Sequence, residues 1–164
     1  MKNKTIWSNR FKNKTSQSFQ KIGSSIHIDK RLYEQDIAAS IVHTQMLMKQ
    51  KIIKSDDGNK IINGLKKIKA LIDKGSFEFK EKYEDIHLNI EKALFEIIGP
   101  SAGFLHTARS RNDQVVTDFK LWIKEASNEI IKDISVVMKN IIKKAEKNTD
   151  TVMPGLTHLK NAQP

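Results

Sequence analysis

The sequence predicts an all-α protein, in which an N-terminal arm and a small helical domain lead into a long helix of a helical bundle. Two observations favour this fold class. Apolar residues recur every three or four positions over four separate stretches, and the 164 residues include only 7 Gly and 3 Pro. We place the arm and the small domain in residues 1–111 and the start of the bundle domain, which is incomplete, in residues 112–164.

The first part of the chain predicts three helices after an extended arm. Residues 1–28 show no clear period and are interpreted as that arm. Asp29 is suited to cap a helix from residue 30 to about 54, since apolar residues follow it at near-helical spacing. Further helices are expected over residues 55–73 and 84–98, where Gly75 and the pair Gly99-Pro100 provide the stop signals.

The longest apolar pattern follows. It predicts a bundle helix from about residue 112 to 147, and a second apolar stripe widens its buried face. Because three shorter helices do not cover two faces of so long a helix, we expect a partner chain or further sequence to pack there. Beyond it we expect a short extended piece, a turn at Pro154-Gly155 and a new helix opening at His158 to Gln163.

Composition limits the possible functions. The absence of Cys excludes disulfides and thiolate metal sites. No apolar run is long enough to span a membrane, and Met1 to Gln20 is polar and basic, unlike a secretory signal, so we expect a cytoplasmic protein. The net charge of +10 invites a nucleic-acid hypothesis. However, the excess is mostly lysine scattered over amphipathic helices, so we expect neither nucleic acid nor membrane as a partner.

Three polar clusters are candidates for chemistry. The strongest is Leu105 to Gln114, which places Arg109, Ser110, Arg111 and Asn112 at the start of the long helix. Helix N-terminal N–H groups attract anions and arginine grips carboxylates in a two-point fork. The segment therefore suggests a site for a small polycarboxylate; the alternative is a capped loop, with Ser110 and Asp113 as the capping pair.

The other two clusters are weaker on chemistry alone. Asp85 and His87 near the start of the third helix suit either a cap or a site. Thr157 and His158 follow Gly155, and the imidazole titrates near neutrality, as a general acid or base requires. Nucleotide-binding and protease-type motifs are absent, and the five histidines lack metal-ligand spacing. We therefore predict no metal.

Taken together, these segments resemble the argininosuccinate lyase family of the fumarase/aspartase superfamily. Leu105 to Gln114 matches the family's "LHT(G/A)RSRNDQ", and Glu84 to His87 matches its "EDIH". Met153 to Pro164 is similar to "PGxTHLQxAQP", Ser24 to Ile37 to "SIxxDxRLxxxDI", and Trp7 to Phe11 to "LWGGRF". The resemblance covers the whole chain in order, but only about the first third of the family's usual length.

The resemblance implies a carbon–nitrogen lyase of arginine biosynthesis, which converts argininosuccinate reversibly to arginine and fumarate by general acid/base catalysis without a cofactor. By the same resemblance His158 is the acid/base group. The substrate-binding residues it implies are Ser25, Ser110, Arg111, Asn112 and Thr157, and Thr157 also stands with His158 among the catalytic residues. Asp85, His87 and Arg109 support the site. The family forms homotetramers whose sites combine segments of three subunits.

Departures from the family pattern also matter. Ser8-Asn9 replaces two glycines, and Lys160 replaces glutamine beside His158. The family's "SSxMPxKxNP" loop, which supplies the serine thought to take the proton, does not occur in residues 1–164, so we expect these residues alone to be inactive. Two alternatives stay open: another lyase of the superfamily, such as one acting on adenylosuccinate, and a non-enzymatic basic helical binding protein.

Overall fold

Helices make up most of the computed structural model, which describes residues 16–163. The predicted all-α class is therefore confirmed. The chain divides into two compact units, Met1–Trp122 and Ile123–Pro164, and helix α6 (Arg111–Glu146) belongs partly to each. The segment Trp7 to Phe11, with Ser8-Asn9, lies outside the described residues.

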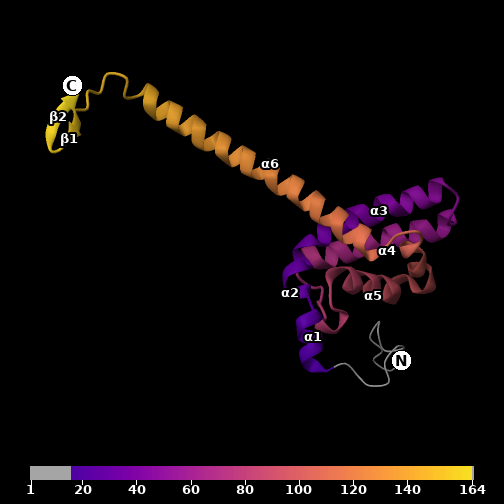
Figure 1. The fold of residues 1–164 in the computed structure, drawn as a ribbon. Coiled ribbons are helices and arrows are strands. Elements are labelled where there is room, and N and C mark those ends of the chain that lie inside the picture. The colour runs from indigo at the N-terminus through magenta and orange to yellow at the C-terminus, as the bar shows by residue number, and fades with distance from the viewer. Residues whose placement is uncertain (1–15, 164) are drawn as a thin grey trace. The chain divides into compact units, whose positions relative to one another are not determined.

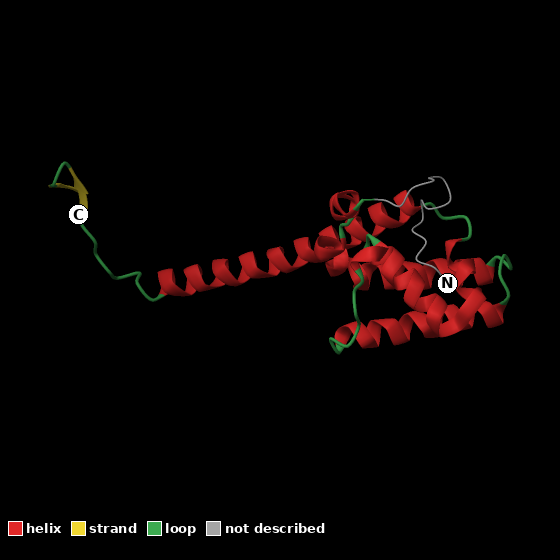
Figure 2. Cartoon of the chain, turned by 90° about the horizontal axis from the view of Figure 1, so that it is seen from below, coloured by secondary structure: helices red, strands yellow, loops and turns green. Residues whose placement is uncertain are grey.

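The first unit is built from helices, shown in red in Figure 2. It contains both α-helices and 3-10 helices (η). In chain order these are α1 (Gln17–Gly23), α2 (Ile26–Asp29), η1 (Lys30–Leu32), α3 (Tyr33–Lys49), α4 (Ser55–Asp73), η2 (Glu81–Tyr83), α5 (Ile86–Ile98), η3 (Gly99–His106) and the start of α6.

The expectation of an extended arm is wrong for residues 17–23 and 26–28, which lie in α1 and α2. Ser16 caps α1, because its hydroxyl accepts a hydrogen bond from the N–H of Phe19 at 3.2 Å. Residues 18–23 of α1 are exposed, so this part of the helix lacks the buried apolar period on which the sequence prediction relied. In α2, only Ile26 is buried.

The core of the first unit lies between α3, α4 and α5, which run side by side in Figure 1. Each helix contributes fully buried aliphatic side chains, such as Ile37, Leu65 and Leu94. Gly64 lets α4 approach α5 closely, because a Cβ atom there would lie 2.5 Å from Cδ1 of Leu94. This tight packing holds the C-terminal half of α5 against α4.

In the second unit, α6 continues to Glu146 with exposed side chains on every side. Its apolar residues are exposed throughout this part: Ile123, Ile130, Ile131, Ile134, Val136, Val137, Met138, Ile141 and Ile142. Within the part of the chain that the structure describes, no helix is long and apolar enough to cross a membrane.

The chain ends in an antiparallel hairpin rather than the expected helix at His158 to Gln163. Strands β1 (Gly155–Thr157) and β2 (Lys160–Gln163) pair Thr157 with Lys160, and the register shifts between Gly155 and Leu156. The turn lies at His158 and Leu159, not at Pro154-Gly155. Both turn residues have positive φ, 51° and 63°, which closes a two-residue hairpin and prevents a helix from starting there.

Candidate active site

Three segments of the first unit meet at the start of α5, and the carbonyl of Glu84 links the first two. This oxygen accepts hydrogen bonds from the N–H of Ser25 at 2.8 Å and of Ile26 at 3.0 Å, and from the hydroxyl of Ser24 at 3.2 Å. Glu84 has φ 63° and ψ −58°, an unfavourable conformation for a residue with a side chain. The strained backbone aims this carbonyl at the Ser24–Ile26 segment.

Ser25 also contacts Asp29, which fastens the same segment a second time. The Ser25 hydroxyl donates to Oδ2 of Asp29 at 2.6 Å, and Oδ1 of Asp29 accepts from the N–H of Ile86 at 3.1 Å. Burial, opposed by the bond from Ser25, raises the pKa of Asp29. The predicted substrate residue Ser25 is thus held beside the "EDIH" segment, with its side chain exposed.

Asp85 connects the start of α5 with the start of α6. Its Oδ1 accepts from the N–H of Leu88 at 2.6 Å and caps α5, as one of the two interpretations of this residue predicts. Its Oδ2 lies 3.9 Å from Nε of Arg111. Asp85 therefore caps α5 and also lies beside Arg111, the predicted anion-binding arginine.

Arg111 lies among polar groups that orient its guanidinium. Nη1 donates to Oε1 of Gln114 at 2.8 Å, and Nη2 donates to Oε2 of Glu91 at 3.2 Å. The hydrogen bond from His106 and then the charge of Arg111 outweigh burial and lower the pKa of Glu91. Sequence reasoning missed Glu91, although it stands four residues after His87 on α5, the spacing that brings residues onto one helix face.

The capped-loop interpretation of Ser110 is confirmed. The N–H of Asp113 donates to the Ser110 hydroxyl at 3.2 Å, and the N–H of Ser110 donates to Oδ2 of Asp113 at 3.3 Å, which is a reciprocal cap. The backbone N–H groups of Arg111 and Asn112 lie in the first turn of α6, where a helix has no internal partners for them. Asn112 is exposed beside them. The cap and an anion site are therefore compatible.

His87 is the centre of a buried acid–histidine cluster formed by Asp36, His87 and Asp118. Nδ1 of His87 lies 3.1 Å from Oδ1 of Asp36 and 3.4 Å from Oδ2 of Asp118. Hydrogen bonds from His87 and other neighbours outweigh burial and lower the pKa of Asp36. Burial, together with the charge of Asp36, raises the pKa of Asp118 to about 8. Asp118 is therefore protonated at neutral pH, while Asp36 keeps the negative charge.

Ligand-type atoms of the buried acid–histidine cluster all lie within 4.8 Å of one another, the only such group among the described residues. The proton on Asp118 and the positive charge of Arg109 already compensate the negative charge of this cluster. Arg109, whose Nη1 donates to the Ser40 hydroxyl at 3.1 Å, is near enough to interact with the negative charge of Asp36, although burial lowers the pKa of Arg109. A divalent cation would have to displace the proton and lie near this guanidinium. The residues therefore fit a metal ion poorly.

Thr157, His158 and Lys160 belong to the second unit and are exposed on its hairpin. The first unit brings together Ser25, Asp85, His87, Arg109, Ser110 and Arg111, and the hairpin holds Thr157 and His158 in two successive positions.

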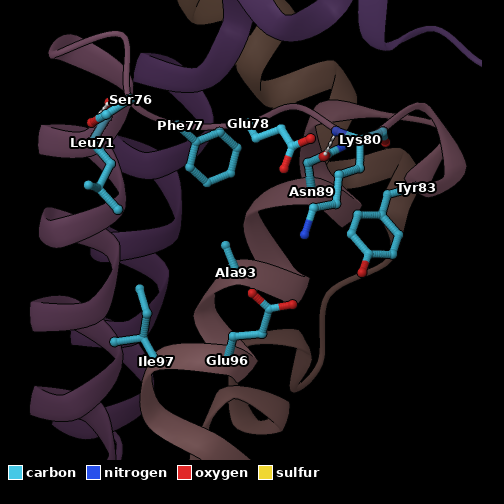
Figure 3. A pocket seen from close by; sticks show the side chains of 10 residues that line it. All are labelled: Leu71, Ser76, Phe77, Glu78, Lys80, Tyr83, Asn89, Ala93, Glu96 and Ile97. Carbon is cyan, nitrogen blue, oxygen red and sulfur yellow. Dashed lines mark hydrogen bonds between the residues drawn. The ribbon is translucent and has the colours of Figure 1, made fainter. Parts of the chain in front are cut away.

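Two hollows lie in the first unit, and the wider one borders some of these polar groups. Figure 3 shows one of about 200 Å³, bordered by Leu71, Phe77, Tyr83, Asn89 and Ile97 among others. Asn89 holds its rim, because its Oδ1 accepts from the N–H of Lys80 at 2.8 Å and its Nδ2 donates to the carbonyl of Asp85 at 2.8 Å. A wider hollow of about 730 Å³ is lined by apolar side chains, such as Val42 of α3 and Leu121 of α6, and by polar ones that include His43, Arg109 and Gln114. The smaller hollow contains no arginine.

In the site of the first unit, Arg111 lies at a helix N-terminus beside hydrogen-bond acceptors and the Ser110 hydroxyl. An arginine at such a position attracts carboxylates. Comparison with known proteins identifies the family. The chain matches the Lyase family over residues 9–164, and it belongs to that family.

Its relatives include named enzymes. The chain is 57% identical over 161 residues to the argininosuccinate lyase of Pelagibacter ubique, covering 98% of this chain and 35% of that protein. It is 48% identical over 159 residues to that of Bartonella bacilliformis, covering 97% and 34%. It is 50% identical over 164 residues to that of Ehrlichia canis, covering 100% and 35%. The chain therefore spans about a third of the length of these relatives.

Proposed function

We propose that this chain supplies the carboxylate-binding part of an argininosuccinate lyase. The observation that carries the proposal is Arg111 at the start of α6. Its side chain is 30% exposed, and its hydrogen bonds to Gln114 and Glu91 use two of the five N–H donors of a guanidinium. The remaining donors, with the N–H groups of the first helical turn, suit a substrate carboxylate.

The proposed reaction is an elimination. A base removes a proton from the carbon beside a carboxylate, the carbon–nitrogen bond on the next carbon breaks, and an acid protonates the leaving guanidino nitrogen, giving fumarate and arginine. Negative charge spreads onto the carboxylate as the proton leaves. That charge would be stabilised by Arg111, Ser110 and Asn112. The substrate would also contact Ser25 and Thr157. His158 would act as the general acid or base.

We further propose a homotetramer in which sites combine residues of different subunits. Two features support it. The apolar side chains of α6 from Ile123 to Ile142 are exposed in the second unit, and a stripe of this size normally packs against another chain. Thr157 and His158 are exposed on the same unit, where a neighbouring subunit can use them. Light scattering of the native protein should give four times the chain mass; a monomer would contradict this assembly.

The test uses the protein as its gene encodes it. Purified protein is mixed with argininosuccinate, and fumarate is followed by ultraviolet absorbance. We expect turnover that Arg111→Gln lowers by about a hundredfold in kcat/KM, the effect of losing a charged transition-state contact. The matched control Lys66→Gln, an exposed cation on α4, should leave turnover unchanged.

A second substrate and a binding assay separate the alternatives. Turnover of adenylosuccinate with none of argininosuccinate would assign the chain to another lyase of the superfamily. No turnover of either, together with salt-sensitive binding of RNA or DNA, would favour the basic binding protein instead.

A further inference from the structure

We infer that Asp36 and Gln114 are positioning residues, which hold the guanidinium of Arg111 in one plane for a carboxylate ligand. The role toward a ligand rests on the proposed function; the positioning of Arg111 does not. The inference stands on a continuous route of hydrogen bonds from α3 to α6, all within the first unit.

The side-chain amide of Gln114 is fixed in one orientation by its two neighbours. Its Nε2 donates to Oδ1 of Asp36, and its Oε1 accepts from Nη1 of Arg111 at 2.8 Å. A carboxylate can only accept and a guanidinium can only donate, so both neighbours require the same orientation of the amide. Asp36 therefore decides which end of Gln114 faces Arg111.

Burial makes this orientation costly to change. Asp36 is 1% exposed and Gln114 is 4% exposed, so water cannot replace either contact. A flipped amide would place its carbonyl against the carboxylate and its NH₂ group against the guanidinium, which leaves buried polar groups unpaired. Asp36 is itself fixed from α5, because Nδ1 of His87 donates to the same Oδ1 atom at 3.1 Å.

The opposite edge of the guanidinium is held as well. Nη2 of Arg111 donates to Oε2 of Glu91 at 3.2 Å, so Gln114 and Glu91 hold one terminal nitrogen each. With both terminal nitrogens held, the plane cannot rotate, while each nitrogen keeps one further N–H. A two-point grip on a carboxylate requires such a fixed plane.

Exchanging the carboxylate at position 36 with the amide at position 114 tests the route of hydrogen bonds from Asp36 to Arg111. Gln114→Glu places two carboxylates against each other, so we expect the amide contact to break and Arg111 to be released. In the double variant Asp36→Asn with Gln114→Glu, the new amide at position 36 donates to the new carboxylate at position 114, which still accepts from Arg111. His87 keeps its contact by changing tautomer. The double variant should therefore recover what the Gln114→Glu variant loses.

The first measurement is kinetic, on the gene-encoded protein with argininosuccinate. Gln114→Glu should raise KM by about tenfold, the double variant should return it to within about threefold of the parent, and kcat should change less than KM. Gln45→Glu, an exposed site on α3, is the matched control and should change neither constant.

The second measurement needs no substrate. An arginine-selective dicarbonyl reagent modifies the protein, and peptide mass spectrometry compares Arg111 with the exposed Arg31 of the same molecule. Arg111 should react about tenfold faster in Gln114→Glu and return toward the parent rate in the double variant, while Arg31 stays constant. If Gln114→Glu does not fold, Gln114→Met is used instead, because it releases Nη1 of Arg111 without adding charge. It should increase the rate at which the reagent modifies Arg111 in the same way.

The outcomes are separable. Equal Arg111 reactivity in the parent and the Gln114 variants, or a double variant no better than Gln114→Glu, would overturn the positioning inference. Absence of argininosuccinate turnover in the parent would instead refute the proposed function, and the reactivity of Arg111 would still decide the positioning.

Discussion

Asp118 provides a quantitative prediction for the pH dependence of stability. Burial and the charge of Asp36 raise its pKa from 3.8 to about 8 in the folded protein. An acid whose folded pKa lies above its unfolded value stabilises the fold fully below the unfolded pKa and loses that contribution as pH rises through the folded pKa. The free energy of unfolding should therefore fall between about pH 4 and pH 8.

The magnitude follows from linkage. Each pKa unit corresponds to about 1.4 kcal/mol, so the three units between about pH 5 and pH 8 give about 4 kcal/mol as an upper limit. The opposite shift of Asp36 acts below the usual pKa of a carboxyl and does not offset this loss. Relaxation around the new charge and entry of water reduce the effect, so we expect a loss of about 2–4 kcal/mol.

Asp118→Asn tests this prediction, because the amide has the shape of the protonated acid and does not titrate. Urea unfolding at fixed protein concentration should give the variant a stability within about 1 kcal/mol of the parent near pH 5, and a higher stability than the parent near pH 8. Asp133→Asn, an exposed acid on α6, is the matched control. Parallel stability profiles for the parent and Asp118→Asn would show that Asp118 holds no proton, and would refute the reasoning.

Two further predictions concern packing and metal binding. Gly64→Ala should destabilise the protein by about 1–2 kcal/mol in urea unfolding, because the cost of overpacking the added methyl against Leu94 exceeds the gain in helix propensity. Gly103→Ala, where nothing lies within 4 Å of the new methyl, should cost no stability. Equal effects at both positions would contradict the packing account. EDTA should leave the thermal unfolding midpoint unchanged, because a proton and Arg109 meet the charge of the buried acid–histidine cluster; a stoichiometric metal ion in the purified protein would count against this.

The sequence predicted the longer helices well, because their buried faces repeat at helical spacing. Helices α4 and α5 begin and end within two residues of the expected positions, and Ile61, Leu65 and Ile68 are buried as the pattern indicates. The helix expected to end at about residue 54 ends at Lys49, where Lys51 adopts a positive φ that interrupts it. Helices α1 and α2 were missed because neither is defined by an apolar face: Ser16 caps α1, and the carbonyl of Glu84 accepts the N–H groups at the start of α2.

The candidate site was predicted by motif and only partly by physical pattern. Arg111 and Ser110 were identifiable because polar residues gather where a long apolar period begins. Asp36, Glu91 and Asp118 were not, because each lies within a helical pattern as an ordinary polar residue. Their importance arises from contacts between separate helices, such as that of Asp36 with Gln114, and no local spacing encodes such pairs.

The contact between Asp36 and Gln114 also has a consequence for synthesis of the chain on the ribosome. The two residues are 78 positions apart, and Asp36 is made first. Until Gln114 and Asp118 emerge, Asp36 lacks two of its buried hydrogen-bond partners, so water cannot leave this part of the core. The first unit should therefore complete its fold only after the start of α6 has left the exit tunnel, and a nascent chain halted before Gln114 should remain open there to proteases.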